Sequence, residues 1–284
     1  MTCIDQMGRK ITLTNWPPRR IVSLVPSQTE FLADLGLEES VVGITKFCIH
    51  PAKWFQQKQR IGGTKTLDFQ KIDDLQPDLI IGNKEENEQG QIELLSQKYP
   101  VWMSDISTLD QALEMMRLLG AITGKPEQAT ALTSAIKHNF KNHLPLLPAI
   151  ANAASVNLLQ MNAEAGNTYH SKAAYLIWRK PYMAAASGTF IDDMLHRAGF
   201  ANAFADLSRY PEISPEQLVD ARPAVILLSS EPYPFSEKHI SALSEICPDA
   251  NIQLVDGELF SWYGSRLLQA PAYFAALREK LSLK

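Results

Sequence analysis

Apolar residues recur at helical spacing in the middle of the chain. On both sides of Lys125 they fall every three or four positions, which is typical of helices with one buried face. Thr108 and Gln111 have the spacing of a capping box, in which each side chain satisfies a backbone group at a helix start. Pro126 suits a first helical position, because its missing N–H costs nothing there. We therefore predict a long helix from Pro126 to His143.

Short apolar runs, many of them β-branched, lie on both sides of these helices and alternate with further helical segments. Such alternation is typical of parallel sheets covered by helices, so we predict an α/β fold with mainly parallel sheets. Ligands of these folds bind beyond the carboxyl ends of the strands, which makes the following loops the candidate site. The predicted strands are residues 10–14, 20–25, 41–44, 78–82, 101–103, 155–160, 175–178, 224–228 and 252–256.

The two halves of the chain repeat one plan. Residues 72–81 and 218–228 each run from helical spacing through a proline into an apolar strand, and 29–36 is echoed more loosely by 189–199. Because the echoes keep their order, we predict two similar lobes; a chance match of short segments is the alternative. The predicted parts are an N-terminal lobe (1–125), a linking backbone helix (126–145) and a C-terminal lobe (146–284).

Local patterns predict further helix boundaries. Ser27 and Glu30 have capping-box spacing for a helix that ends at Leu35, with Gly36 just past its end. The box recurs at 214–217. The other specific predictions are a loop of small residues at 183–188 and one amphipathic helix over 267–281.

Composition limits the classes of partner. The 284 residues are 45% hydrophobic, with a formal net charge of −4, which argues against a nucleic acid or an anionic membrane as the partner.

Three cysteines without paired spacing favour reduced thiols. The first ten residues contain no apolar run, so we expect no signal peptide and a cytoplasmic monomer. The alternative is a periplasmic protein whose signal has been removed.

Aromatic and polar residues follow the predicted strands, which suits a large flat organic ligand. For each aromatic residue, a place in a lobe core is the equally plausible alternative. Arg266 has two possible roles, pairing with a ligand carboxylate or with a carboxylate of the fold. The candidates identified in this way are Pro26, Ser27, Phe47, Asn83, Lys84, Glu85, Met183, Trp262 and Arg266.

Sequence signals for catalysis are weak. The chain lacks Gly-x-Ser-x-Gly, a Walker A motif, a dinucleotide fingerprint and His-Glu-x-x-His, so we expect no catalytic residues, no resident metal and no covalent cofactor. A metal site built from His50, His170 and a carboxylate is the alternative.

Several segments together resemble the helical-backbone (class III) substrate-binding proteins of ABC importers. They are 20–30, 42–44, 61–63, 75–81 and 187–190. The likeness extends from about Arg20 to the end of the chain and is greatest to members that bind cobalamin or iron chelates. It implies two lobes joined by one rigid helix, no reaction, and a metal chelate (a corrinoid, haem or a ferric siderophore) held in the cleft between the lobes.

The aromatic residues that contact the corrin in cobalamin binders match this chain unevenly. The resemblance assigns Phe47 and Tyr210 to ligand contact, with tyrosine replacing tryptophan at 210. Two other tryptophans are replaced by Thr64 and Asn83. The resemblance therefore supports a metal chelate more strongly than it supports cobalamin.

The resemblance also implies docking on an ABC permease through one glutamate per lobe. Glu216 matches the second of these, whereas Gln70 stands at the first, where Asp68 is a possible substitute.

Two other functions are left open. One is a zinc- or manganese-binding protein of related architecture, and the other is a cytoplasmic enzyme or handling protein for a corrinoid.

Overall fold

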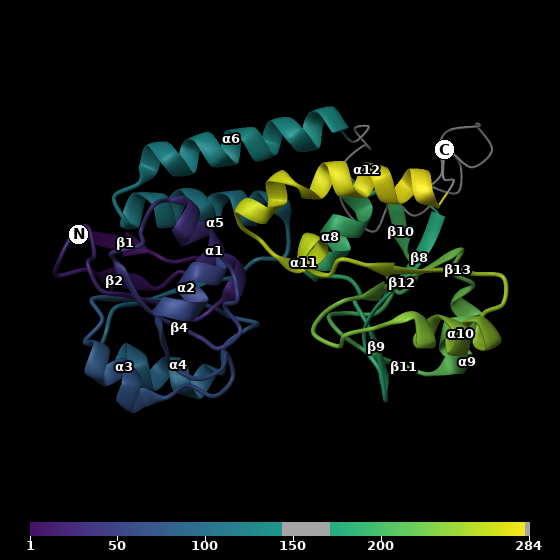
Figure 1. Ribbon diagram of the computed structural model, residues 1–284, viewed down its shortest axis with the longest axis horizontal. Coiled ribbons are helices and arrows are strands. Elements are labelled where there is room, and N and C mark those ends of the chain that lie inside the picture. Colours follow the sequence, from purple (N-terminus) through teal and green to yellow (C-terminus); the bar gives the residue numbers. More distant parts are fainter. Residues whose placement is uncertain (144–170, 282–284) are drawn as a thin grey trace. The chain divides into compact units, whose positions relative to one another are not determined.

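The computed structural model describes residues 1–143 and 171–281 (Figure 1), which form two compact units. The N-terminal unit comprises Met1–Lys137 and Trp262–Leu268, and the C-terminal unit comprises the described parts of His138–Ser261 and Gln269–Lys284. This division differs from the expected one, since it falls within the long helix and places the segment Trp262–Leu268 in the N-terminal unit. The strand expected at 155–160 lies outside the described residues.

The N-terminal unit is built on a parallel five-stranded sheet of order β5-β4-β3-β6-β7. Every residue of β3, β6 and β7 is buried, as expected of strands covered on both faces. The strands are β3 Ile21–Ser23, β4 Val41–Ile44, β5 Gln59–Arg60, β6 Leu79–Asn83 and β7 Val101–Ser104, with a separate antiparallel pair, β1 Thr2–Ile4 and β2 Lys10–Thr12. The helices are α1 Pro26–Asp34, α2 Ala52–Gln57, α3 Phe69–Leu75, α4 Gln89–Ser96, α5 Leu109–Ile122 and α6 Pro126–His143, which continues into the C-terminal unit.

The C-terminal unit contains a mixed sheet of order β11-β9-β8-β12-β13, with β10 also paired to β8. β8, β10, β12 and β13 are parallel, whereas β9 is antiparallel to β8 and β11. The strands are β8 Ser171–Trp178, β9 Tyr182–Ala184, β10 Phe200–Asn202, β11 Glu212–Ile213, β12 Val225–Ser229 and β13 Asn251–Val255. The α-helices in the described part of this unit are α8 Phe190–Arg197, α9 Pro215–Ala221, α10 Glu237–Ile246, α11 Glu258–Ser261 and α12 Ala270–Lys280. The predicted α/β fold with mainly parallel sheets is confirmed.

The repeated plan is confirmed in detail. Both α3 and α9 end at a residue in the left-handed conformation, Gln76 (φ 43°) and Arg222 (φ 47°), and a proline then leads into a buried strand. The looser echo also holds, because Gly36 and Gly199 follow α1 and α8 with positive φ, as glycine permits at a helix end.

Two of the three predicted capping boxes are present. Those of Thr108 with Gln111 and Ser214 with Gln217 form as expected, whereas the one predicted from Ser27 and Glu30 is wrong. Helix α1 begins two residues earlier than a Ser27 cap requires, at Pro26, because proline fits the first turn without losing a hydrogen bond.

Two other local predictions are wrong. Residues 183–188 do not form a loop throughout, since the segment begins inside β9, which pairs with strands on both sides. Residues 267–281 are not one helix, because a short 3-10 helix, Ser265–Leu268, ends before α12 begins. Across the described ranges, no helix combines the length and apolar character needed to cross a bilayer.

Candidate functional site

Buried polar side chains stand at the carboxyl edge of the N-terminal sheet. Ser104 ends β7, and its Oγ accepts hydrogen bonds from Gln28 Nε2 (2.6 Å) and Asn83 Nδ2 (2.9 Å). Thr29 Oγ1 donates to Ser23 Oγ at the end of β3 (2.8 Å). Gln28 Oε1 is buried and has no hydrogen-bond partner, so this edge retains one unused acceptor.

Beside this edge, Phe47 follows β4 and is 50% exposed. The Lys46 Nζ lies 5.1 Å from the centre of its ring, within cation–π range. A Cβ at Gly63 would lie only 3.2 Å from Phe47 Cε2, so the absence of a side chain at 63 leaves space for the ring. Ile49 is also exposed. The loop after β4 therefore presents an apolar surface to solvent.

The polar residues predicted after β6 mainly order their own loop. Asn83 is buried, and its Oδ1 accepts from the backbone N–H groups of Glu85 (2.8 Å) and Glu86 (3.1 Å). Lys84 Nζ pairs with the Asp105 carboxylate at 2.6 Å. The half-buried Thr64 accepts a hydrogen bond from Asn87 through its carbonyl oxygen. These contacts join the loop to neighbouring residues of its own unit.

Trp262 and Arg266 belong to the N-terminal unit, contrary to the prediction. Trp262 is only 7% exposed and packs edge-on against His50, with ring centres 5.6 Å apart. The Arg266 guanidinium lies 4.9 Å from the Trp262 ring and makes a bidentate ion pair with Glu30, at 2.9 and 2.7 Å. The sequence left two roles open for each residue, one in ligand contact and one within the fold. These contacts fit a core position for Trp262 and an ion pair within the fold for Arg266.

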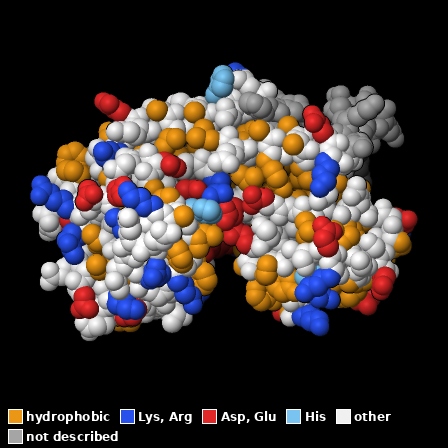
Figure 2. Space-filling view, in the orientation of Figure 1, with side chains coloured by type: hydrophobic (Ala, Val, Ile, Leu, Met, Phe, Trp, Pro, Cys, Tyr) orange, Lys and Arg blue, Asp and Glu red, His pale blue; other side chains and the backbone are white. Residues whose placement is uncertain are grey.

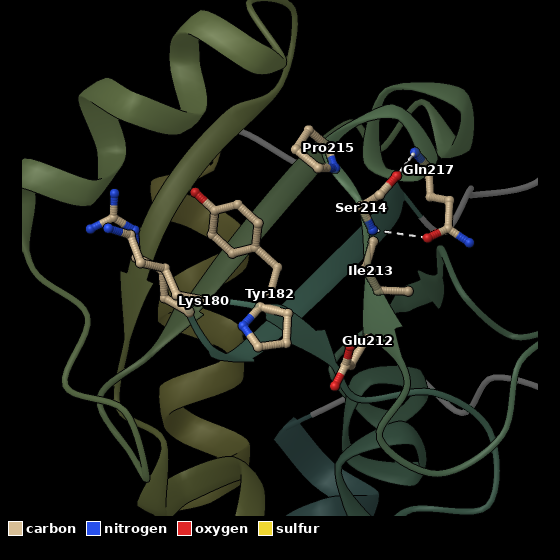
Figure 3. A pocket seen from close by; sticks show the side chains of 9 residues that line it. Lys180, Tyr182, Glu212, Ile213, Ser214, Pro215 and Gln217 are labelled. Carbon is tan, nitrogen blue, oxygen red and sulfur yellow. Dashed lines mark hydrogen bonds between the residues drawn. The ribbon is translucent and has the colours of Figure 1, made fainter.

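The C-terminal unit carries a pocket of about 520 Å³ at the carboxyl end of β8 (Figure 3). One side is the turn between β8 and β9, and the other is β11 with the start of α9. In the close-up, the Tyr182 ring lies between Lys180 and Ser214. The lining residues are Arg179, Lys180, Pro181, Tyr182, Glu212, Ile213, Ser214, Pro215 and Gln217.

Two donors of this pocket come from consecutive basic residues. Hydrogen bonds to the phenol oxygens of Tyr182 and Tyr233 raise the pKa of Arg179. Lys180 has a positive φ of 65°, which is uncommon for a residue other than glycine. Opposite them, Ser214 and Gln217 are occupied by their own capping box, as the dashed lines of Figure 3 show.

The other predicted residues of the C-terminal unit lie close to this pocket in the sequence. Met183 is half-buried in β9 and pairs with Glu212 of β11. Tyr210 is also half-buried, with the Arg209 guanidinium 5.9 Å from its ring centre. Glu216, the second residue of α9, follows the pocket residue Pro215.

Sequence reasoning missed Arg179, Lys180, Tyr182 and Glu212. Two basic residues directly after the apolar run at 175–178 were an available signal, because ligands gather at the carboxyl ends of strands. Glu212 gave no comparable signal, since it reaches the pocket only through the pairing of β11 with β9.

The metal site considered from the sequence is only partly described, since His170 lies outside the described residues. Within 1–143 and 171–281, no three histidine, cysteine or acidic side chains are grouped closely enough to hold an ion.

A sequence profile of periplasmic binding proteins matches residues 21–244. The chain belongs to this family. It is 25% identical over 216 residues to the vitamin B12-binding protein of Vibrio cholerae serotype O1 (strain ATCC 39541), covering 75% of this chain and 71% of that one.

Solved structures of the family share the fold. The haem-binding protein RhuT of Roseiflexus sp. RS-1, in apo form, superposes with a TM-score of 0.73 and 22% identity over 93% of this chain and 99% of its own. The vitamin B12-binding protein BtuF of Vibrio cholerae gives a TM-score of 0.73 and 21% identity over 94% and 99%. At these identities the likeness establishes the two-lobed architecture of the family.

Proposed function

We propose that this periplasmic binding protein is the substrate-binding component of an ABC importer and binds a metal chelate, either a corrinoid, haem or a ferric siderophore. The observation that carries the proposal is the half-exposed Phe47 ring beside Lys46, at the carboxyl edge of a parallel sheet. An aromatic face left open at this position suits a flat, partly apolar ligand. The relatives named for vitamin B12 and haem bind ligands of this class.

The proposal is tested by titrating the purified protein with cyanocobalamin, haem and a ferric catecholate while recording absorption spectra. We expect saturable one-to-one binding of at least one chelate, with a shift of its visible bands. Folded protein that binds none of the three would overturn the proposal. Zinc or manganese retained through purification would instead favour a metal-ion carrier, and chemical turnover of a bound chelate would favour a handling enzyme.

Partner and location are parts of the same proposal. The importer role requires an ABC permease, and the relatives in solved structures are periplasmic proteins. The importer role would require a location outside the cytoplasmic membrane, whereas the cytoplasmic location expected from the sequence stays a competing prediction. Cell fractionation with an antibody against the native protein distinguishes the two. Recovery from the periplasmic fraction would contradict the cytoplasmic location.

A further inference from the structure

Two basic residues line the C-terminal pocket, and their partners differ from those of the ion-paired lysines and arginines of the chain. Lys84, Arg197 and Arg266 each pair with a carboxylate within 3 Å. Among the described residues, neither Arg179 nor Lys180 makes such an ion pair, although both line the same pocket. In Figure 2, Lys and Arg side chains surrounded by hydrophobic ones lie where Figure 1 places the tip of β9. The chain therefore holds two positive charges here without a neutralising partner.

The pocket's remaining groups favour an anion over a neutral ligand. Ser214 and Gln217 satisfy each other, and Glu212 is the single lining carboxylate. The Arg179 guanidinium hydrogen-bonds to the phenols of Tyr182 and Tyr233, so its positive charge and the Lys180 ammonium are what the pocket offers a ligand, and both match carboxylate or phenolate oxygens. A volume of about 520 Å³ lies within the usual range for small-molecule sites.

The N-terminal unit repeats this pairing of a cation with an aromatic ring. Lys46 lies over Phe47 and makes no ion pair among the described residues, and both follow β4 at the carboxyl edge of its sheet. Each unit thus presents an aromatic ring and unneutralised positive charge at the edge where ligands of parallel sheets bind. The net charge of the chain is −4, so these cations do not reflect a generally basic protein.

We propose that the bound chelate is anionic, and that acidic groups on its edge bind Arg179 and Lys180. This inference rests on the proposed chelate-binding function and selects within it. It favours a chelate bearing carboxylates, such as haem, or phenolate oxygens, such as a ferric catecholate, over cobalamin, whose periphery carries neutral amides. Guanidinium and ammonium groups bind such oxygens through charge-assisted hydrogen bonds, which amide groups cannot match.

The test compares charge removal at two ends of one strand. The double variant R179Q/K180N removes both pocket charges, and asparagine tolerates the positive φ at position 180 better than most residues. The control K172Q removes an exposed charge at the start of β8, whereas Arg179 directly follows the end of that strand. Haem, a ferric tris-catecholate and cyanocobalamin are titrated against each protein, with thermal unfolding as the check on folding.

We expect the wild-type protein to bind an anionic chelate more tightly than cyanocobalamin. R179Q/K180N should weaken that binding by about 10- to 100-fold while leaving cyanocobalamin binding unchanged, and K172Q should alter neither. Raising salt from 50 to 500 mM should weaken anionic binding to the wild type more than to the double variant. If the double variant does not fold, K180N alone should show a smaller loss of the same selectivity.

The opposing results are distinct. A wild-type protein that binds none of the three chelates removes the proposed function itself. Tightest binding of cyanocobalamin, or equal losses for charged and neutral chelates in R179Q/K180N, overturns only the charge assignment. Normal binding of every chelate with reduced uptake through the permease would instead make this pocket a partner surface, which also overturns it.

Discussion

At the scale of single residues, Phe47 and Trp262 show how the surroundings of an aromatic side chain decide its role. Both were candidates for ligand contact, yet Phe47 is 50% exposed and Trp262 only 7%. Trp262 is held by His50 and Arg266 within one unit. Phe47 has solvent on one side, so a ligand can cover it without disturbing the core. Truncating Phe47 should therefore weaken ligand binding, whereas truncating Trp262 should lower the stability of the fold.

We predict that F47A weakens chelate binding by about two- to tenfold, the value of one aromatic contact, with little change in the unfolding midpoint. W262A should instead lower the free energy of unfolding by about 3–5 kcal/mol, because it empties a packed site. Chelate titration and urea denaturation measure the two effects. L94A, at an apolar residue 54% exposed on α4, should change neither. Unfolding caused by F47A with unchanged affinity per folded molecule would place Phe47 in the core.

The buried thiols give a second prediction at this scale. Burial raises the pKa of Cys48 and of Cys247, so a smaller fraction of each is thiolate near pH 8 than in a free cysteine. We expect Ellman's reagent to label both slowly in the native protein and rapidly in 6 M guanidinium chloride. Labelling of the native protein should accelerate as the pH rises, because the thiolate forms only towards the raised pKa. Rapid native labelling of both at pH 8 would contradict their burial.

At the scale of elements, α3 and α9 carry equivalent positions at their first turns. Gln70 and Glu216 are each the second residue of a helix, preceded by a capping side chain, Asp68 or Ser214. The Ser214 hydroxyl and the backbone N–H of Glu216 itself hold the pKa of Glu216 below its ordinary value. Glu216 therefore keeps its charge at neutral pH and loses it only as the pH falls through that lowered pKa. Asp68 caps its own helix and pairs with Lys71.

We predict that Q70E strengthens coupling to the cognate permease, because it restores a charge at the position equivalent to Glu216. A charge-assisted contact of about 2 kcal/mol corresponds to roughly thirtyfold in affinity. E216Q should weaken docking by a similar factor. Stimulation of permease ATPase activity in proteoliposomes measures both, with E114Q at an exposed position of α5 as the control. No gain from Q70E would mean that docking does not use this position.

The elements also show which features a sequence determines locally. The capping boxes of α5 and α9, and the helix–proline–strand repeat, were predictable because residues three or four apart set them. The box at Ser27 failed because α1 begins at Pro26, which leaves Ser27 inside the helix, and Glu30 pairs instead with Arg266, 236 positions away. The pocket was missed because it too depends on residues far apart in the sequence. Arg179 and Gln217 line one cavity only because β9 pairs with both β8 and β11, and that pairing leaves little trace in the pattern of either segment.

At the scale of the whole molecule, the connection between the units is more than the single predicted helix. The chain passes from one unit to the other within α6, after Ser261 and after Leu268. The returning segment is anchored on α1, since Arg266 pairs with Glu30, and Ser265 Oγ donates a hydrogen bond to the Asp34 carboxylate. A Cβ at Gly264 would lie 2.7 Å from Ser27 O, so only glycine allows this close backbone approach.

We therefore predict that ligand binding changes the separation of the two units very little. A hinge needs a few residues free to change φ and ψ, whereas one crossing lies inside a regular helix and the other two flank a segment held by a mostly buried ion pair. Small-angle X-ray scattering profiles recorded with and without saturating chelate should nearly coincide. As a control, R266A removes the ion pair, and any closure on binding should then be larger than in the wild type. A large fall in the wild-type radius of gyration on binding would show that these three crossings bend, and that the anchored segment does not restrain them.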